Sequence, residues 1–192
     1  MKTIELLKSL ERLNKTFYSI MDLEKITGLS RNSLYVVVKR LADRGVLEKI
    51  GKGIYRPFTA KPSIEKIAAS LYMPNYLSFE SVLSRYGVFN LVPYTLTFAT
   101  TRKTKRLTVE GRDIEFRQIK KELFWGYEIQ GGTYVAKPEK AFLDLVYIAS
   151  RGIASIDVDE LDTKKLSMAT VKELSKRFPI YTQKYLNKFI SS

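Results

Sequence analysis

The chain has 192 residues, of which 45% are hydrophobic and 28% charged, a composition typical of a folded globular protein. It contains no cysteine and no histidine, which excludes disulfides, zinc sites built from these residues, and cysteine or histidine catalysis. Its 33 basic and 20 acidic residues give a formal net charge of +13 at pH 7. A charge of this size favours an anionic partner by long-range attraction.

Neither a membrane span nor a signal peptide is expected. No apolar run approaches the roughly 18 residues that a membrane helix needs. The first apolar residues are interrupted by charges at Glu5, Lys8, Glu11 and Arg12, unlike the apolar core of a signal peptide. We therefore expect a cytoplasmic protein with no membrane partner, and no residue pattern calls for a metal or a cofactor.

The first 57 residues predict two helices that are followed, after a tight turn, by a third. Residues 2–13 carry leucine and isoleucine at helical spacing with charges on the other face. Ser19 and Asp22 match a capping box that opens a helix over 20–27. Gly28 ends that helix, and Ser30 caps the next one, over 31–44.

A short hairpin is predicted after the third helix. Residues 46–50 and 54–56 have strand character, and the glycine-bracketed turn 51–53 joins them. Helix, helix, turn, helix and hairpin is the order of a winged helix-turn-helix. We therefore predict a winged helix-turn-helix DNA-binding domain over 1–57, a linker over 58–62, and a second domain over 63–192.

The predicted third helix has one apolar face and one polar face. Leu34, Val38 and Leu41 fall on the apolar face, so the N-terminal residues Arg31 and Asn32 are the candidates for reading bases in the major groove. The hairpin adds cations for phosphate contact. The full set of candidate DNA-contacting residues is Ser30, Arg31, Asn32, Ser33, Tyr35, Lys39, Arg40, Lys49, Lys52 and Arg56. One such domain reads a short site, so we expect a homodimer or cooperative binding on double-stranded operator DNA.

The second domain is predicted to be mixed α/β, which makes the whole chain α+β. Its sheet is expected to be mainly antiparallel, and its last third helical. Pro138 opens a strongly apolar helix, 139–150. Other helices are predicted over 63–71, 78–86, 158–166, 168–178 and 180–190, and strands over 94–101, 107–109, 114–117, 125–129 and 133–136.

A basic segment stands out within this domain. Cations outnumber carboxylates between residues 102 and 121, and they are Arg102, Lys103, Lys105, Arg106, Arg112, Arg117, Lys120 and Lys121. Such a segment is consistent with a solvated loop, with phosphate contact, or with an acidic face on a partner. Asp113 and Glu115, with the lysines nearby, also weakly match the carboxylate clusters of metal-dependent nucleases.

Several sequence segments of the second domain resemble those of the antitoxin family of the abortive-infection AbiE systems. They occur in the order found in that family, at residues 76–87, 92–95, 100–106, 116–120, 124–127 and 136–144. The predicted winged helix-turn-helix fits the same family. On this resemblance, Phe79, Leu83, Tyr94, Pro138, Ala141, Leu143 and Leu145 are taken as structural positions.

The resemblance implies an antitoxin of a type IV toxin–antitoxin pair. Such an antitoxin represses its own operon through the winged helix and counteracts a nucleotidyltransferase-like toxin without a stable complex. The candidate antitoxin surface comprises Arg102, Lys103, Lys105, Arg106, Arg117, Lys120 and Lys121. Two alternatives stay open: a stand-alone transcriptional regulator whose second domain senses a ligand or dimerises, and a metal-dependent nuclease that uses Asp113 and Glu115.

Overall fold

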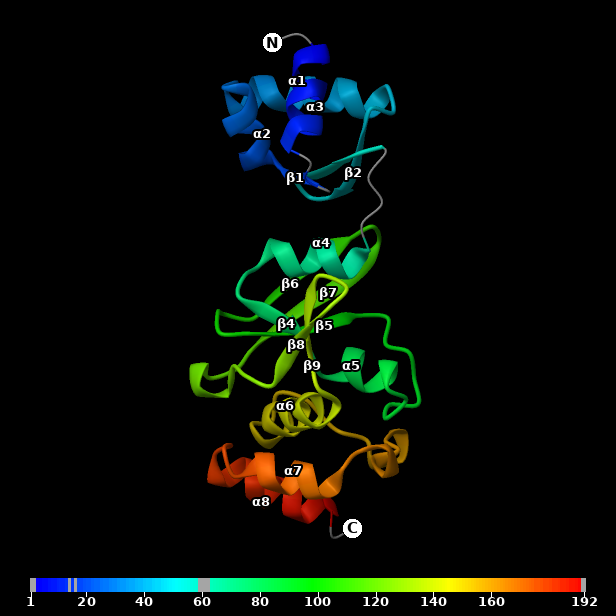
Figure 1. Cartoon of the computed structure of the whole chain (residues 1–192), viewed down its shortest axis with the longest axis vertical. Helices are drawn as coiled ribbons and strands as arrows, with labels where there is room; N and C mark the ends of the chain where they lie inside the picture. The colour runs from blue at the N-terminus through cyan, green and yellow to red at the C-terminus, as the bar shows by residue number, and fades with distance from the viewer. Residues whose placement is uncertain (1–2, 14, 16, 59–62, 191–192) are drawn as a thin grey trace. The chain divides into compact units, whose positions relative to one another are not determined.

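The computed structural model describes residues 3–13, 15, 17–58 and 63–190 (Figure 1). Its residue contacts divide the chain into two compact units. Unit 1 comprises Met1–Ile67 together with the turn Thr108–Gly111, and unit 2 comprises Ala68–Leu107 and Arg112–Ser192. Of the predicted linker, Phe58 is exposed, and residues 59–62 lie outside the described residues.

Unit 1 contains the three helices and the hairpin that the sequence predicts. The helices are α1 (Thr3–Leu13), α2 (Ile20–Thr27) and α3 (Arg31–Asp43). The strands β2 (Leu47–Gly51) and β3 (Ile54–Pro57) form the antiparallel hairpin, and a two-residue strand, β1 (Tyr18–Ser19), pairs with the free edge of β3. Gly51 also pairs with Val109 from the turn that belongs to this unit.

Local hydrogen bonds set the helix boundaries of unit 1. The Ser19 Oγ accepts from the Asp22 backbone N–H at 3.1 Å, and the Asp22 carboxylate accepts from the Ser19 backbone N–H at 2.8 Å, which completes the predicted capping box. Gly28 ends α2 in the left-handed conformation, with φ 66°. These caps fix the short connection of residues 28–30, and Ser30 then caps α3.

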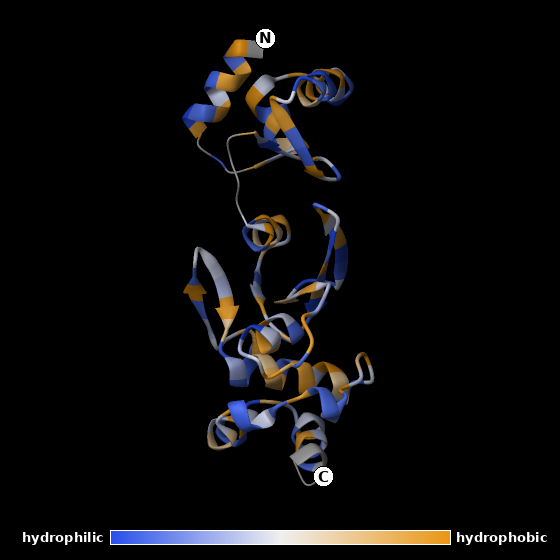
Figure 2. Ribbon diagram, turned by 90° about the vertical axis from the view of Figure 1, so that its right-hand side faces the viewer, coloured by the Kyte–Doolittle hydropathy of each residue, from blue (hydrophilic) through white to orange (hydrophobic). Residues whose placement is uncertain are grey.

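The helices of unit 1 enclose one apolar core. The buried side chains are Leu6, Leu10, Tyr18, Leu23, Leu34, Val38, Leu41, Leu47 and Tyr55. In Figure 2 the helix next to the N-terminus shows alternating hydrophobic and hydrophilic bands, as expected for a helix with one packed face. The buried Tyr18 hydroxyl donates to the Leu10 carbonyl at 2.7 Å, so its one polar atom is satisfied.

Unit 2 is built on a mixed sheet, with strands in the order β6-β7-β5-β4-β9-β8. The strands are β4 (Asn75–Leu77), β5 (Leu96–Thr100), β6 (Lys105–Val109), β7 (Arg112–Gln118), β8 (Tyr127–Gln130) and β9 (Thr133–Ala136). β4 is antiparallel to β5, and β8 to β9, whereas β5 is parallel to β7 and β4 is parallel to β9. The sheet is thus mixed, and its two parallel pairings have no signal in the sequence.

Helices complete unit 2 and cover the central strands of the sheet, whereas most residues of β6 and β8 are not buried. They are α5 (Glu80–Arg85), α6 (Pro138–Ser150), α7 (Met168–Ser175) and α8 (Ile180–Ile190), and α4 (Ile64–Leu71) crosses the division between the units. Figure 1 shows α6 between the sheet and the pair α7 and α8. Because α6 has neighbours on most sides, all its residues from Lys140 to Ala149 are buried. No helix in the described part of the chain is long and apolar enough to cross a membrane.

Three details of unit 2 differ from the predictions. Residues 158–166 form two 3-10 turns, Val158–Glu160 and Thr163–Lys165, instead of a helix, because Leu161 between them bridges to Phe89. Residues 75–77 form a strand that was not predicted, since all three are buried and show no alternation. Tyr94, expected to be a structural position, has a side chain that is 69% exposed and lies outside the core.

Candidate nucleic-acid interface and basic pocket

Helix α3 separates its core residues from the candidate base-reading residues as predicted. Leu34, Val38 and Leu41 are essentially unexposed. The opposite face is open to solvent, and its exposed residues are Arg31, Asn32, Ser33, Tyr35, Val36, Lys39 and Arg40. Ser30 caps this helix and its hydroxyl bonds the Ser33 hydroxyl at 3.0 Å. The N-terminal half of α3 therefore carries polar side chains of the types that contact base edges and phosphates.

Arg31 already has a partner within unit 1. Its Nε and Nη2 donate to the two carboxylate oxygens of Glu24 on α2, at 2.9 and 3.1 Å. This hydrogen bond and the charge of Arg31 lower the pKa of the Glu24 carboxyl. This pair uses two of the five guanidinium N–H groups, so Nη1 and the second N–H of Nη2 stay available for a guanine while Glu24 holds the side chain.

The hairpin cations fall into two groups. Lys49 and Lys52 are exposed, and Lys52 occupies the turn between β2 and β3. Arg56 instead pairs with Glu48 and with Glu110 from the turn that belongs to unit 1, and its side chain is only 13% exposed. The charge of Arg56 is thus neutralised inside the unit, so the structure favours the two lysines over Arg56 as phosphate contacts.

In unit 2, most of the predicted antitoxin surface is exposed. Arg102, Lys103, Lys105, Arg106, Lys120 and Lys121 are open to solvent. The Arg102 guanidinium and the Lys105 ammonium both lie over the Tyr72 ring, at 4.2 and 4.8 Å from its centroid, so this ring holds the two charged groups. Arg117 differs from the rest, because its side chain is only 16% exposed.

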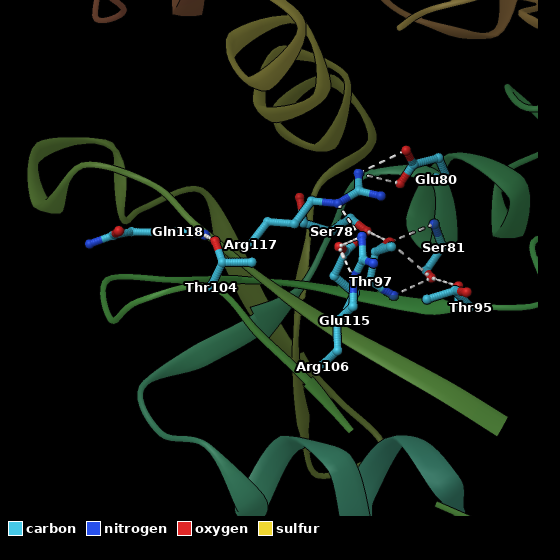
Figure 3. A network of polar contacts seen from close by, with 10 residues as sticks. All are labelled: Ser78, Glu80, Ser81, Thr95, Thr97, Thr104, Arg106, Glu115, Arg117 and Gln118. Carbon is cyan, nitrogen blue, oxygen red and sulfur yellow. Dashed lines mark hydrogen bonds and ion pairs between the residues drawn. The ribbon is translucent and has the colours of Figure 1, made fainter. Parts of the chain in front are cut away.

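Arg117 lies at the centre of an ion-pair network on β7 (Figure 3). Its Nη1 donates to both carboxylate oxygens of Glu80 at 2.8 Å, and its Nε donates to Glu115 at 2.8 Å. The second oxygen of Glu115 accepts from the Arg106 Nε at 2.8 Å. Burial alone would raise the pKa of Glu115, but the hydrogen bonds and charges of Arg117 and Arg106 outweigh it and lower that pKa.

Hydrogen bonds between β5 and the start of α5 place Glu80 toward this network. The Thr97 hydroxyl donates to the Ser78 carbonyl at 2.8 Å, and the Thr97 N–H donates to the Ser81 Oγ at 2.8 Å. Helix α5 begins at Glu80 rather than at the predicted Ser78, because Phe79 between them has φ 57° and ψ −140°, outside the helical region. Figure 3 shows Arg117 extended toward Glu80 from the strand.

Beside this network lies a pocket with a volume of about 460 Å³. It is lined by residues 104–106 of the β6 end, by Glu115, Arg117 and Gln118 of β7, and by Ile148, Arg151, Ile153 and Ala154 at and after the end of α6. A second hollow, of about 250 Å³, is lined by Gln118, Ile119, Lys120, Tyr147 and Arg151. Gln118 and Arg151 line both, so the two hollows are neighbours.

A buried polar cluster forms a separate feature of unit 2. Lys140 and Asp144, one turn apart on α6, form an ion pair in which both side chains are 0% exposed. The Tyr76 and Ser78 hydroxyls donate to Asp144 at 2.9 Å. Burial lowers the pKa of the Lys140 ammonium and raises that of the Asp144 carboxyl, and their mutual attraction offsets this only in part.

No family model matches the chain, and no curated protein does either. Function is therefore inferred from the residues and from the geometry described above.

The carboxylates of the nuclease alternative do not form a ready metal site. Glu115 is buried, and both its oxygens already accept from arginine guanidinium groups. Within the described ranges, no three Asp or Glu side chains cluster in a way that would hold a metal ion. Asp113 is exposed on the same strand, two residues away from Glu115.

Sequence reasoning missed two features that the fold brings together. The Lys140–Asp144 pair had one visible signal, an i, i+4 pair of opposite charges inside an otherwise apolar helix. Arg151 had none, because it directly follows α6 as its C-cap and reads as an ordinary helix-terminal cation. Only the fold brings Arg151 into the lining of the same pocket as Arg106 and Glu115.

Proposed function

We propose that the chain is a DNA-binding transcriptional repressor whose unit 1 acts as a winged helix-turn-helix, with α3 in the major groove and the β2–β3 hairpin as the wing. One observation carries the proposal: the N-terminal half of α3 exposes Arg31, Asn32 and Tyr35 while Leu34 and Val38 seal its other face. The exposed Lys49 and Lys52 add phosphate-binding charge on the hairpin.

Glu24 is expected to affect how Arg31 discriminates between DNA sequences. Its ion pair with Arg31 holds the guanidinium at the start of α3. The remaining N–H groups of Nη1 and Nη2 can donate to a guanine while Glu24 fixes the orientation of the guanidinium, and the negative charge of Glu24 opposes phosphate contact at sites without that guanine. Glu24→Gln should therefore strengthen binding to unrelated DNA more than binding to the operator.

The first experiment is an electrophoretic mobility shift with the chain's own upstream DNA and a scrambled duplex, at low and high salt. Asn32→Ala should reduce the difference in binding free energy between the two duplexes by about 1–3 kcal/mol, the discrimination that one bidentate base contact provides. Lys52→Ala should weaken both alike and reduce the salt dependence. Lys8→Ala, an exposed cation on α1, is the matched control. Equal binding of both duplexes by the unmodified chain would overturn the proposal.

We further propose, from the resemblance to the AbiE antitoxins, that unit 2 counteracts a nucleotidyltransferase-like toxin, with the exposed basic residues as its working surface. The support is the sequence resemblance together with the exposure of Lys103, Lys120 and Lys121. The test is growth rescue by the chain when a neighbouring toxin gene is expressed in the same cells. Lys120→Ala/Lys121→Ala should lose rescue while Lys172→Ala, an exposed lysine on α7, retains it. The assignment of this surface is contradicted if neither the double variant nor Lys172→Ala rescues growth, or if the two variants rescue growth equally.

A further inference from the structure

The pocket of unit 2 carries more positive charge than its carboxylates can neutralise. Together with the adjoining hollow it is lined by five cations, Lys105, Arg106, Arg117, Lys120 and Arg151, and by one carboxylate, Glu115. Glu80 contributes a second carboxylate through Arg117 without lining the pocket. A recess lined with this excess of positive charge concentrates anions.

The five cations differ in how far their charged groups are already paired within the unit. Arg117 forms ion pairs with both Glu80 and Glu115, so its positive charge is neutralised within the unit. Arg106 shares Glu115 but keeps an 83% exposed side chain. Lys105 directs its ammonium to the Tyr72 ring, 4.8 Å from the centroid, and Tyr72 packs against Phe116 rather than against Glu115 and Arg117. In the described part of the chain no carboxylate pairs with Lys120 or Arg151. Arg151 contacts Tyr147 instead: its Nη1 donates to the hydroxyl at 3.4 Å, and the guanidinium lies 5.3 Å from the ring centroid. Lys120, Arg151 and the largely exposed Arg106 can therefore donate further hydrogen bonds to an anionic ligand.

The remaining walls are apolar or neutral. Ile148, Ile153 and Ala154 also line the pocket, and Gln118 and Thr104 add an amide and a hydroxyl group to its lining. A bare phosphate ion would leave the aliphatic wall uncovered. A cavity of about 460 Å³ instead lies within the range of roughly 300–1,000 Å³ that holds small organic ligands.

We propose that this pocket binds a nucleoside phosphate, with the phosphate groups on Arg151, Arg106 and Lys120 and the nucleoside against Ile148, Ile153 and Ala154. Guanidinium and ammonium groups form strong charge-assisted hydrogen bonds with phosphate oxygens. Gln118 can donate to and accept from a base edge. The pocket contains no residue of α3, so this proposal stands independently of DNA binding by unit 1.

Isothermal titration calorimetry of the full chain tests the proposal with ADP, GDP, CDP and UDP, each compared with inorganic pyrophosphate. At least one nucleoside diphosphate should bind about tenfold more tightly than pyrophosphate, since only the nucleotide covers the aliphatic wall. Arg151→Ala should weaken that binding by about tenfold, the loss expected for one charge-assisted hydrogen bond. Lys172→Ala, which changes the net charge equally on α7, should bind like the parent.

Two further variants separate pocket binding from general charge effects. Ala154→Phe fills the pocket without changing its charge and should abolish nucleotide binding. Arg151→Glu reverses the charge at an exposed position, so it tests the same site if the phenylalanine variant fails to fold. The absence of binding by all four nucleotides overturns the proposal. The proposal is also overturned if pyrophosphate binds as tightly as the nucleotides, or if Arg151→Ala and Lys172→Ala lose the same amount of nucleotide affinity.

Discussion

Replacement of Lys140 by methionine offers a direct test of the buried cluster in unit 2. Methionine fills a similar volume but leaves the Asp144 carboxylate without its cation, in a site where both side chains are 0% exposed. The Tyr76 and Ser78 hydroxyls still donate to Asp144. Removing one partner of a buried ion pair costs about 3–5 kcal/mol.

The structure limits this cost, because an unpaired buried carboxyl takes up a proton instead of staying charged. The ordinary pKa of an aspartate is 3.8. At about 1.36 kcal/mol for each unit of pH above that value, protonation of Asp144 in the folded variant costs about 4 kcal/mol at pH 7 and about 1.6 kcal/mol at pH 5. The pKa of Asp144 is raised in the folded state, so the variant regains stability as the pH falls toward 3.8.

The assay is urea unfolding followed by circular dichroism at pH 5, 6 and 7, with Lys172→Met as the exposed control. Lys140→Met should lower the free energy of unfolding of unit 2 by about 3–5 kcal/mol at pH 7 and by less than half of that at pH 5. Adding Asp144→Leu should recover part of the loss, although the Tyr76 and Ser78 hydroxyls then lack their acceptor. A loss that is small, or unchanged between pH 5 and pH 7, would refute the buried-pair explanation.

Three further predictions concern stability. Glu115→Gln should flatten the acid limb of the pH–stability curve, because the lowered pKa of Glu115 adds stability above its ordinary value of 4.5 that is lost as the pH falls through the folded pKa; identical acid limbs would contradict this. Gly126→Ala should lower the Tm more than Gly152→Ala: both glycines have a left-handed φ, but only at Gly126 does the new Cβ fall 2.9 Å from the buried Lys140 Cγ. Ser19→Ala should destabilise unit 1 by about 0.5–2 kcal/mol in chemical unfolding, whereas Ser9→Ala, which removes no cap, should not.

Much of unit 1 was predictable because its signals are local. A helix cap such as Ser19 with Asp22, or a left-handed glycine such as Gly28, acts within three or four residues of itself, so its effect is visible in the sequence. The apolar face of α3 follows from helical periodicity in the same way. The resemblance to the AbiE antitoxins and the function it implies stay predictions, which the proposed DNA-binding and rescue experiments test.

The arrangement of unit 2 depended on contacts between residues far apart in the chain. Strand order and parallel pairing have no local signature in the sequence. The hydrogen bond from Tyr76 to Asp144 has none either, because the two residues lie 68 positions apart. The same holds for Glu80, which neutralises Arg117 and so removes it from the exposed basic surface. By itself the sequence determined the helices and caps of unit 1 and the excess of positive charge. The tertiary structure alone decided which charges are buried in pairs and which line a pocket, because partner choice is set by packing across the sheet rather than by spacing along the chain.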